Sequence, residues 1–236
     1  MGAPDEGFAV YYRYLAAAQK SSVGVSHYSR WVNRPWGRVL ASACRVVGLS
    51  PNQVTAISGL TSLAGLVLLV LVPPHPLVGV AVGFLLMLGF AFDSADGQLA
   101  RLRGGGSPLG EWLDHIVDSA KTPLVHLAVA VAAWRFYDLD PLWLVVPLGF
   151  TVVGVVLYTG TLLTPFLLAR KPSQEEPRRP STLRSLLLLP ADYGVLATSF
   201  LLTGVPAVFV PVYTLLGIAT ALITVALLVS WMRRLG

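Results

Sequence analysis

Charged residues are scarce in this sequence. Aspartate, glutamate, lysine and arginine make up 12% of the 236 residues, whereas a soluble domain has about 25%. Hydrophobic residues make up 55% of the chain, and the mean hydropathy is +0.69. A chain of this composition would not stay in solution unless lipid covered much of its surface. We therefore exclude an ordinary soluble domain and expect an integral membrane protein.

Cysteine is nearly absent as well. The single Cys44 forbids an intramolecular disulfide, and it cannot form a metal cluster on its own. The first 50 residues lack the apolar run of a signal peptide, so we expect no export. The sequence also lacks an internal repeat and a long low-complexity tract, which favours one membrane domain.

Six apolar stretches are long enough to cross about 30 Å of hydrocarbon, which takes about 20 residues each. They cover residues 54–72, 77–99, 111–134, 142–168, 187–203 and 207–231. Pro190, Asp192 and Gly194 interrupt the start of the fifth stretch. The expected fold is an all-α integral membrane protein with six transmembrane helices.

The basic residues are sorted to one side of this six-span arrangement. Of the 17 Lys and Arg residues, Arg135 alone falls on the other side, and Lys121 lies within a span. The positive-inside rule then places both termini in the cytoplasm. We expect a multi-pass protein of the cell membrane. The same sorting attributes the net charge of +5 to a membrane surface, and we expect no nucleic-acid partner.

The segment before the first span is amphipathic. Apolar residues recur at helical spacing, and arginines occupy another face: the former are Trp31, Trp36, Val39, Leu40, Ala43 and Val47, and the latter are Arg34, Arg38 and Arg45. This pattern favours a helix in the cytoplasmic membrane interface over a connecting helix packed on the bundle. We therefore divide the chain into a cytoplasmic extension (1–27), an interfacial juxtamembrane helix (28–50) and a six-helix membrane domain (51–236).

Four aspartates lie where the second span ends and the third begins. Asp93 and Asp96 are three residues apart, and Asp114 and Asp118 are four apart, so each pair shares a helix face. Antiparallel helices would place Asp93 level with Asp118 and Asp96 level with Asp114. Both pairs would then lie near the cytoplasmic end of the two spans.

Cations are the expected partners of these carboxylates. A charged aspartate at the centre of a membrane helix costs about 2.5–3.5 kcal/mol, and four facing one another would also repel. Their spacing suits two divalent ions about 3.5–4 Å apart. Hard oxygen ligands indicate Mg²⁺ or Mn²⁺.

Small residues and one arginine accompany the aspartates. Gly97 leaves backbone open to a ligand, and Ala100 lies on the same side of the helix. Gly110 could allow close helix contact or ligand approach, and Arg101 offers a cation to a phosphate. The acids alone would also suit a divalent-cation or proton transporter. A transporter site is expected near the membrane midplane, often with repeats, and a non-catalytic scaffold would need neither Arg101 nor all the acids.

The pattern Asp93-x2-Asp96-Gly97-x2-Ala100-Arg101-x8-Gly110-x3-Asp114-x3-Asp118 resembles the signature of the CDP-alcohol phosphotransferase (CDP-alcohol phosphatidyltransferase) family at all eight fixed positions. The six spans, the basic interfacial helix and Pro51-Asn52-x2-Thr55 also look like this family. The likeness covers most of the chain from Tyr28 onward.

This resemblance implies a magnesium-dependent enzyme that moves a substituted phosphate from a CDP-linked donor to an alcohol and releases CMP. It implies that two Mg²⁺ or Mn²⁺ ions are held by Asp93, Asp96 and Asp114, with Asp118 as a further ligand and the general base. It also implies a CDP pocket, and the residues expected to line it are Asn52, Thr55, Gly97, Ala100, Arg101 and Gly110. A homodimer is expected because relatives are commonly dimeric.

The substrates stay open at this point. CDP-diacylglycerol, used in phospholipid biosynthesis, is the first expectation for the donor. The alternative is a CDP-polyol such as CDP-inositol, joined to a polyol phosphate. Lys121 could contact an acceptor phosphate or pair with an aspartate, and Arg184 in the basic loop after the fourth span could bind a phosphorylated acceptor. Asp192 is expected to cap the fifth span rather than to orient an acceptor hydroxyl.

Overall fold

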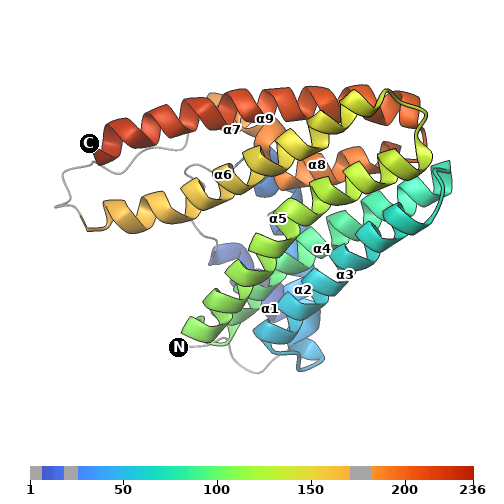
Figure 1. Ribbon diagram of the computed structural model, residues 1–236. Helices are drawn as coiled ribbons and strands as arrows, with labels where there is room; N and C mark the ends of the chain where they lie inside the picture. Colours follow the sequence, from blue (N-terminus) through green and yellow to red (C-terminus); the bar gives the residue numbers. More distant parts are fainter. Residues whose placement is uncertain (1–6, 19–25, 171–181) are drawn as a thin grey trace.

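The computed structural model describes residues 7–18, 26–170 and 182–236 (Figure 1). Within these ranges every regular element is a helix or a helical turn, and no strand occurs. The helices are α1 (Phe8–Ala17), α2 (Arg34–Val46), α3 (Pro51–Leu71), α4 (Pro76–Leu102), α5 (Pro108–Phe136), α6 (Val145–Leu168), α7 (Thr182–Leu187), α8 (Tyr193–Ser199) and α9 (Pro206–Leu235). The short π or 3-10 turns are η1 (Ser29–Asn33), η2 (Pro141–Leu144), η3 (Leu189–Ala191) and η4 (Phe200–Leu202).

Proline stands at the first position of the long helices α3, α4, α5 and α9 and of η2, which leads into α6. Proline suits this position because its φ is already helical and its missing N–H would have had no partner. Side chains cap four of these starts: Ser50 with Gln53 at α3, His75 at α4, Ser107 at α5 and Asp140 at η2. The helices therefore begin one to three residues before the predicted spans.

Five helical segments of the described chain are long and apolar enough to cross a membrane. They are Pro51–Leu71, Pro76–Leu102, Pro108–Phe136, Pro141–Leu168 and Pro206–Leu235.

The predicted fifth span, 187–203, is wrong as a single continuous helix. It is divided into the end of α7, then η3, α8 and η4. Pro190 lacks an N–H, and the side chain of Asp192 accepts a hydrogen bond of 2.7 Å from Gly194 N, so a new helix starts there. The apolar helical part, Tyr193–Leu202, is shorter than the length that spans about 30 Å of hydrocarbon.

The long helices converge at one end of the bundle and diverge at the other (Figure 1). The connections α3–α4, α5–η2 and η4–α9 gather at the converging end. At the other end α4 passes into α5, and α6 and α9 lie apart from α3, α4 and α5. We call this second end the carboxylate end, because Asp93 and Asp118 lie toward it along α4 and α5.

Close helix contact fixes the distance between α3 and α4 near these aspartates. Gly89 lies one turn before Asp93, and a Cβ at Gly89 would collide with Ser62 Oγ. Ser58 Oγ donates a hydrogen bond of 2.9 Å to the carbonyl oxygen of Gly89. Only a glycine permits this approach, so it helps to position Asp93 beside α3.

The helix α2 packs on α4 by its small residues. Gly37, Ala41 and Cys44 are buried, whereas Trp31 and Trp36 are 60% and 61% exposed. The sequence-based pattern did not include Gly37, Ala41 or Cys44 and rested on other apolar residues of this segment. The exposed tryptophans are free to lie in a membrane interface.

The helix α1 covers α2 and buries Tyr11 and Leu15. The guanidinium of Arg38 lies over the ring of Tyr12 and donates a hydrogen bond of 3.0 Å to its hydroxyl. No sequence signal predicted this helix.

Replacing Gly89 tests the α3–α4 contact. Gly89→Val should destabilise the protein by about 1–3 kcal/mol, because the added side chain forces α3 and α4 apart. Thermal unfolding of the purified protein in detergent measures the effect. Gly149→Val on α6 is the matched control, since a Cβ at exposed Gly149 meets no atom within 4 Å. Equal melting temperatures for the two variants would contradict the packing described here.

Candidate active site

A tight turn folds the end of α4 back onto the start of α5. Gly104 and Gly105 have φ values of 96° and 137°, a region that favours glycine. Gly105 N donates a hydrogen bond of 3.0 Å to the carbonyl oxygen of Ala100. Ser107 Oγ then accepts one of 3.0 Å from Gly110 N and starts α5. The turn makes the two helices antiparallel, as expected for consecutive membrane spans.

Three of the predicted aspartates come together at this hairpin. Asp93, Asp114 and Asp118 each offer one carboxylate oxygen, and these atoms all lie within 4.8 Å of one another. Each of the three residues is partly buried. The group draws on two helices and is open enough for a ligand to reach it.

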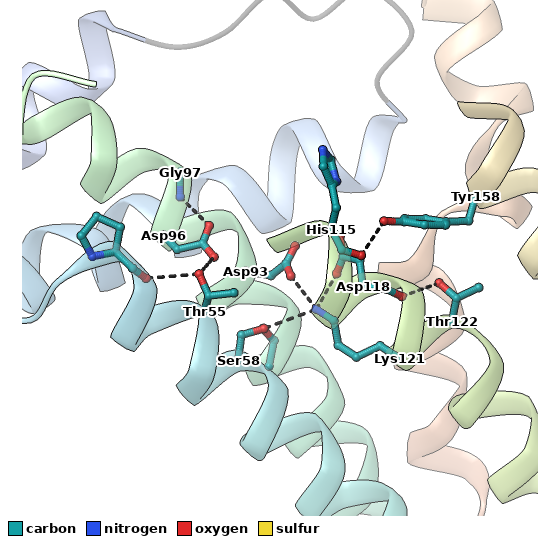
Figure 2. A network of polar contacts seen from close by, with 12 residues as sticks. Thr55, Ser58, Asp93, Asp96, Gly97, His115, Asp118, Lys121, Thr122 and Tyr158 are labelled. Atoms are coloured by element: carbon teal, nitrogen blue, oxygen red, sulfur yellow. Dashed lines mark hydrogen bonds and ion pairs between the residues drawn. The ribbon is translucent and has the colours of Figure 1, made fainter. Parts of the chain in front are cut away.

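The ammonium of Lys121 lies between the carboxylates of Asp93 and Asp118 (Figure 2). Lys121 Nζ is 2.5 Å from Asp93 Oδ1 and 2.8 Å from Asp118 Oδ1. It also donates a longer hydrogen bond of 3.4 Å to Ser58 Oγ on α3. Of the two roles considered for Lys121, the pairing with an aspartate is the one observed, and the pairing is with two.

Asp96 lies outside this group of three. It is buried, and its Oδ2 accepts a hydrogen bond of 2.5 Å from Thr55 Oγ1 on α3. Its Oδ1 accepts one of 2.5 Å from the backbone N–H of Gly97. The carboxylate of Asp96 is therefore turned toward α3, while Asp114 joins Asp93 and Asp118.

The remaining predicted residues border the α3–α4 side of the cluster. A Cβ at Gly97 would have open space, with Arg101 Nη1 as its nearest neighbour at 3.9 Å. Gly110 faces Asn52, whose Oδ1 would lie 3.1 Å from a Cβ there. Ala100 lies one turn beyond Asp96 and is partly exposed.

Arg101 carries an unsatisfied polar atom. Its Nε is buried and makes no hydrogen bond within the part of the chain that the structure describes. A buried donor without a partner is costly, so an anionic ligand at this position would relieve the cost. This observation fits a phosphate group next to Arg101.

On the opposite side of the cluster, hydrogen bonds connect α5 internally and to α6. Tyr158 Oη donates a hydrogen bond of 2.8 Å to the carbonyl oxygen of His115. Thr122 Oγ1 donates one of 2.9 Å to the carbonyl oxygen of Asp118 (Figure 2). Sequence reasoning missed Ser58, Thr122 and Tyr158. Ser58 and Thr122 follow Thr55 and Asp118 by one helical turn, which was the available signal.

The cap predicted at Asp192 is confirmed, and Asp192 has further partners. Its Oδ1 caps α8, and its Oδ2 accepts hydrogen bonds from the hydroxyls of Ser26 and Ser29, the latter at 2.6 Å. These contacts join the segment before α2 to the start of α8. The side chain of Arg184 and the residues Lys171, Arg178 and Arg179 lie outside the described part of the chain.

The donor set fits a divalent cation. Three carboxylate oxygens converge, the ligands are all hard oxygen atoms, and a protonated lysine already lies between two of them. Mg²⁺ and Mn²⁺ prefer such ligands. Asp96, the fourth predicted ligand, is not in this group, and its two carboxylate oxygens accept hydrogen bonds from Thr55 and Gly97.

Replacing Lys121 tests the charge balance. Lys121→Met should lower the free energy of unfolding in metal-free buffer by about 1–3 kcal/mol, because two partly buried carboxylates lose their cation. Added Mn²⁺ should raise the melting temperature of this variant more than that of the parent. Thermal unfolding with and without Mn²⁺ measures both effects, and Lys121→Arg is the charge-preserving control. A metal-free Lys121→Met protein as stable as the parent would contradict this account.

Comparison with known proteins bears on this site. The family model for CDP-alcohol phosphatidyltransferase matches residues 48–232. The chain is 28% identical over 169 residues to choline/ethanolaminephosphotransferase 1 of Arabidopsis thaliana. The aligned region covers 68% of this chain and 42% of that protein. It is 40% identical over 93 residues to phosphatidylinositol phosphate synthase of Corynebacterium glutamicum, or 39% of each chain. The chain thus spans about two fifths of the length of these curated relatives.

Solved structures have the same fold. Phosphatidylinositol phosphate synthase of Mycobacterium tuberculosis in complex with manganese and citrate superposes with a TM-score of 0.53, at 23% identity, over 83% of this chain and 85% of that one. The same enzyme with CDP-DAG bound gives 0.53, at 22% identity, over 86% and 92%. At this level of identity the likeness shows the fold alone.

Family membership and the five long apolar helices together identify a multi-pass membrane protein. The matched region runs from just before α3 nearly to the end of α9, and it contains all four aspartates. The chain therefore belongs to the CDP-alcohol phosphatidyltransferase family.

Proposed function

We propose that this protein transfers a substituted phosphate from a CDP-linked donor to an alcohol acceptor and releases CMP. The observation that carries the proposal is the convergence of Asp93, Asp114 and Asp118 on one point, beside Asp96 and Arg101, in a member of this family. An enzyme needs these groups together, because the donor brings two phosphates and the acceptor must lose a proton.

The residues on α3 and α4 form the donor side of the site. The buried Nε of Arg101 lacks a partner in the described chain and would donate to a donor phosphate. Gly97 leaves space for the donor to approach α4, and Asn52, Thr55, Ala100 and Gly110 border the same side. Thr55 has a second role, since it donates to Asp96 Oδ2 and holds that carboxylate in place.

The carboxylates divide the work of metal binding and proton removal. Asp93, Asp96, Asp114 and Asp118 would hold two Mg²⁺ or Mn²⁺ ions, which supply charge stabilisation as the bond to CMP breaks. Asp118 would accept the proton of the acceptor hydroxyl, since its carboxylate is on the α5 side and partly exposed. Lys121 would keep Asp93 and Asp118 apart and oriented before the substrates bind.

We propose six membrane crossings with the carboxylate end and both termini in the cytoplasm. The segment from η3 to η4 supplies the additional crossing as a broken helix. Asp192 at its start contacts Ser26 and Ser29, and Gly204 after its end packs against His75 in the α3–α4 connection. Broken helices are tolerated at membrane depth where they are buried in protein. Leu196, Ala197 and other α8 and η4 residues are buried.

The sorting of the basic residues supports this orientation, and the exposed Trp31 and Trp36 support an interfacial position for residues 28–50 before the membrane domain 51–236. Residues 1–27 would be a cytoplasmic extension, with α1 packed on α2. We further propose a homodimer in the cell membrane.

CDP-diacylglycerol is the donor we propose, within phospholipid biosynthesis. It is the ligand bound in the Mycobacterium tuberculosis relative of the same fold. A soluble donor such as CDP-inositol, joined to a polyol phosphate, is the alternative. The name of one curated relative refers to choline and ethanolamine, and the name of the other refers to phosphatidylinositol phosphate. Because these names point to different substrates, the donor is a question for the assay.

Release of CMP tests the proposed reaction. Purified protein with Mg²⁺, CDP-diacylglycerol and a panel of alcohols should release CMP, and Asp118→Asn should slow the release by roughly 10²–10⁴-fold, because an amide cannot act as the base. Asp138→Asn, at an exposed position in the α5–η2 connection, is the matched control and should keep full activity. A cation or proton transporter would instead move ions across the membrane of proteoliposomes without releasing CMP, and that result would refute the proposed enzymatic function.

A further inference from the structure

Lys121 occupies space that a divalent ion could otherwise take within the carboxylate group. Its Nζ lies 2.5 Å from Asp93 Oδ1 and 2.8 Å from Asp118 Oδ1, and Asp114 is the third member of this group. The spacing of the aspartates suits two divalent ions about 3.5–4 Å apart. An ammonium that bonds to two of the ligands competes directly with one of those ions.

The hydrogen bonds of Lys121 indicate a permanent member of the site. An ammonium has three N–H donors, and three acceptors surround this one: Asp93 Oδ1, Asp118 Oδ1 and, at 3.4 Å, Ser58 Oγ. The side chain of Lys121 is 11% exposed, and Ser58 is itself fixed by its hydrogen bond to the carbonyl oxygen of Gly89. An ion that displaced the ammonium would leave a buried charge without these partners, which is costly.

The geometry of α5 places the ammonium beside the aspartates. Lys121 follows Asp118 by three residues, so the two side chains share a face of the helix. Side chains on a helix lean toward its N-terminus, and Lys121 therefore extends back toward Asp118 and, across the hairpin, toward Asp93 on α4 (Figure 2). The ammonium thus approaches the group from the side away from the α4–α5 turn.

The formal charge of the group suits a single divalent ion. Three carboxylates and one ammonium together carry a charge of −2, which one divalent ion cancels. A second ion would leave an excess of two positive charges next to the ammonium in a partly buried site, where like charges repel more strongly than in water. Asp96 and Arg101, on the α3–α4 side, have opposite charges and leave this balance unchanged. The negative charges on the two phosphates of a CDP-linked donor would cancel the excess.

We propose that Lys121 sets the order in which the cations bind. The substrate-free protein holds one divalent ion together with the ammonium, and a second ion binds only together with the diphosphate of a CDP-linked donor. We assign the first ion to the side of Asp114, because the ion pairs of Lys121 involve Asp93 and Asp118. Lys121 is thereby a positioning residue that acts through these two aspartates.

The inference rests on the proposed function, since it takes the donor to be a CDP compound. Its consequence is that the donor and the second ion each increase the affinity of the other, because coupling between two binding sites is reciprocal. The full set of cations would then be present only when there is a donor to act on.

Counting bound Mn²⁺ tests this order without requiring turnover. The full chain in phosphatidylcholine nanodiscs is titrated with Mn²⁺, alone and with CDP, which carries the diphosphate common to the candidate donors. One ion per chain should bind without CDP and two with it, and CDP should tighten the binding of the second ion by roughly 5–150-fold. Two ions about 3.5–4 Å apart also couple magnetically, so the EPR spectrum of bound Mn²⁺ should broaden only with CDP. Empty nanodiscs with CDP correct for Mn²⁺ bound by lipid and free nucleotide.

Variants of Lys121 test the role of the ammonium. Lys121→Met removes the charge and should bind two Mn²⁺ per chain without CDP. Lys121→Arg is the matched control, since it keeps the charge, and it should bind one. If Lys121→Met does not fold, as judged by gel filtration, Lys121→Gln keeps a hydrogen-bonding side chain without the charge and should also bind two.

Several outcomes would overturn the inference. They are two ions per chain in the parent without CDP, a single ion in a folded Lys121→Met or Lys121→Gln protein, and a second ion that fails to bind with CDP. CMP release is measured on the same preparations. The expected ion counts without CMP release from any donor and acceptor would contradict the proposed function alone, and CMP release with other ion counts would contradict only the proposed order.

Discussion

The ammonium of Lys121, held between Asp93 and Asp118, is the contact on which the rest of this site depends. Two like charges about 4 Å apart repel by roughly 4 kcal/mol at the effective dielectric constant near a protein surface. Three carboxylates within 4.8 Å therefore need a cation inside the group before any substrate arrives. The helix α3 can support this arrangement because Gly89 lets it approach α4, and Ser58 then reaches both Gly89 and Lys121. Packing and charge balance are thus coupled at the same turn of α4.

The sequence predicted the parts of this arrangement that depend on local spacing. Asp93 and Asp118 are at the same level because a short turn between two helices fixes their register, and Lys121 now bonds to both. The orientation of Asp96 could not be predicted in the same way, because it depends on which face of α3 presents Thr55. The broken fifth span has a similar explanation. A hydropathy prediction averages side-chain hydrophobicity over a window of residues. The helix is interrupted by backbone effects that this average does not include, namely the cap at Asp192 and the missing N–H of Pro190. Prolines at positions 51, 76, 108 and 206 mark the helix starts, one to three residues before the spans predicted from hydropathy.

The two sides of the carboxylate cluster differ in chemistry because different helices build them. Asn52, Thr55 and Arg101 give the α3–α4 side polar groups and a cation, which suit a nucleotide diphosphate. On the other side, Phe150, Leu157 and Leu196 present hydrocarbon to a cavity of about 180 Å³ between α5, α6, α9 and the η3–α8 segment.

The same division separates the residues of the signature from those of the cavity. The signature residues lie at the end of α4 and the start of α5, with Asn52 and Thr55 at the start of α3. The cavity takes much of its wall from α6, α8 and α9, which the signature does not include. A substitution at Gly154 or Leu196 can therefore reshape the cavity while the hydrogen bonds of Asp96 and the ion pairs of Lys121 stay intact. Recognising the signature accordingly identifies the transfer chemistry, whereas the alcohol must be inferred from the helices that follow it.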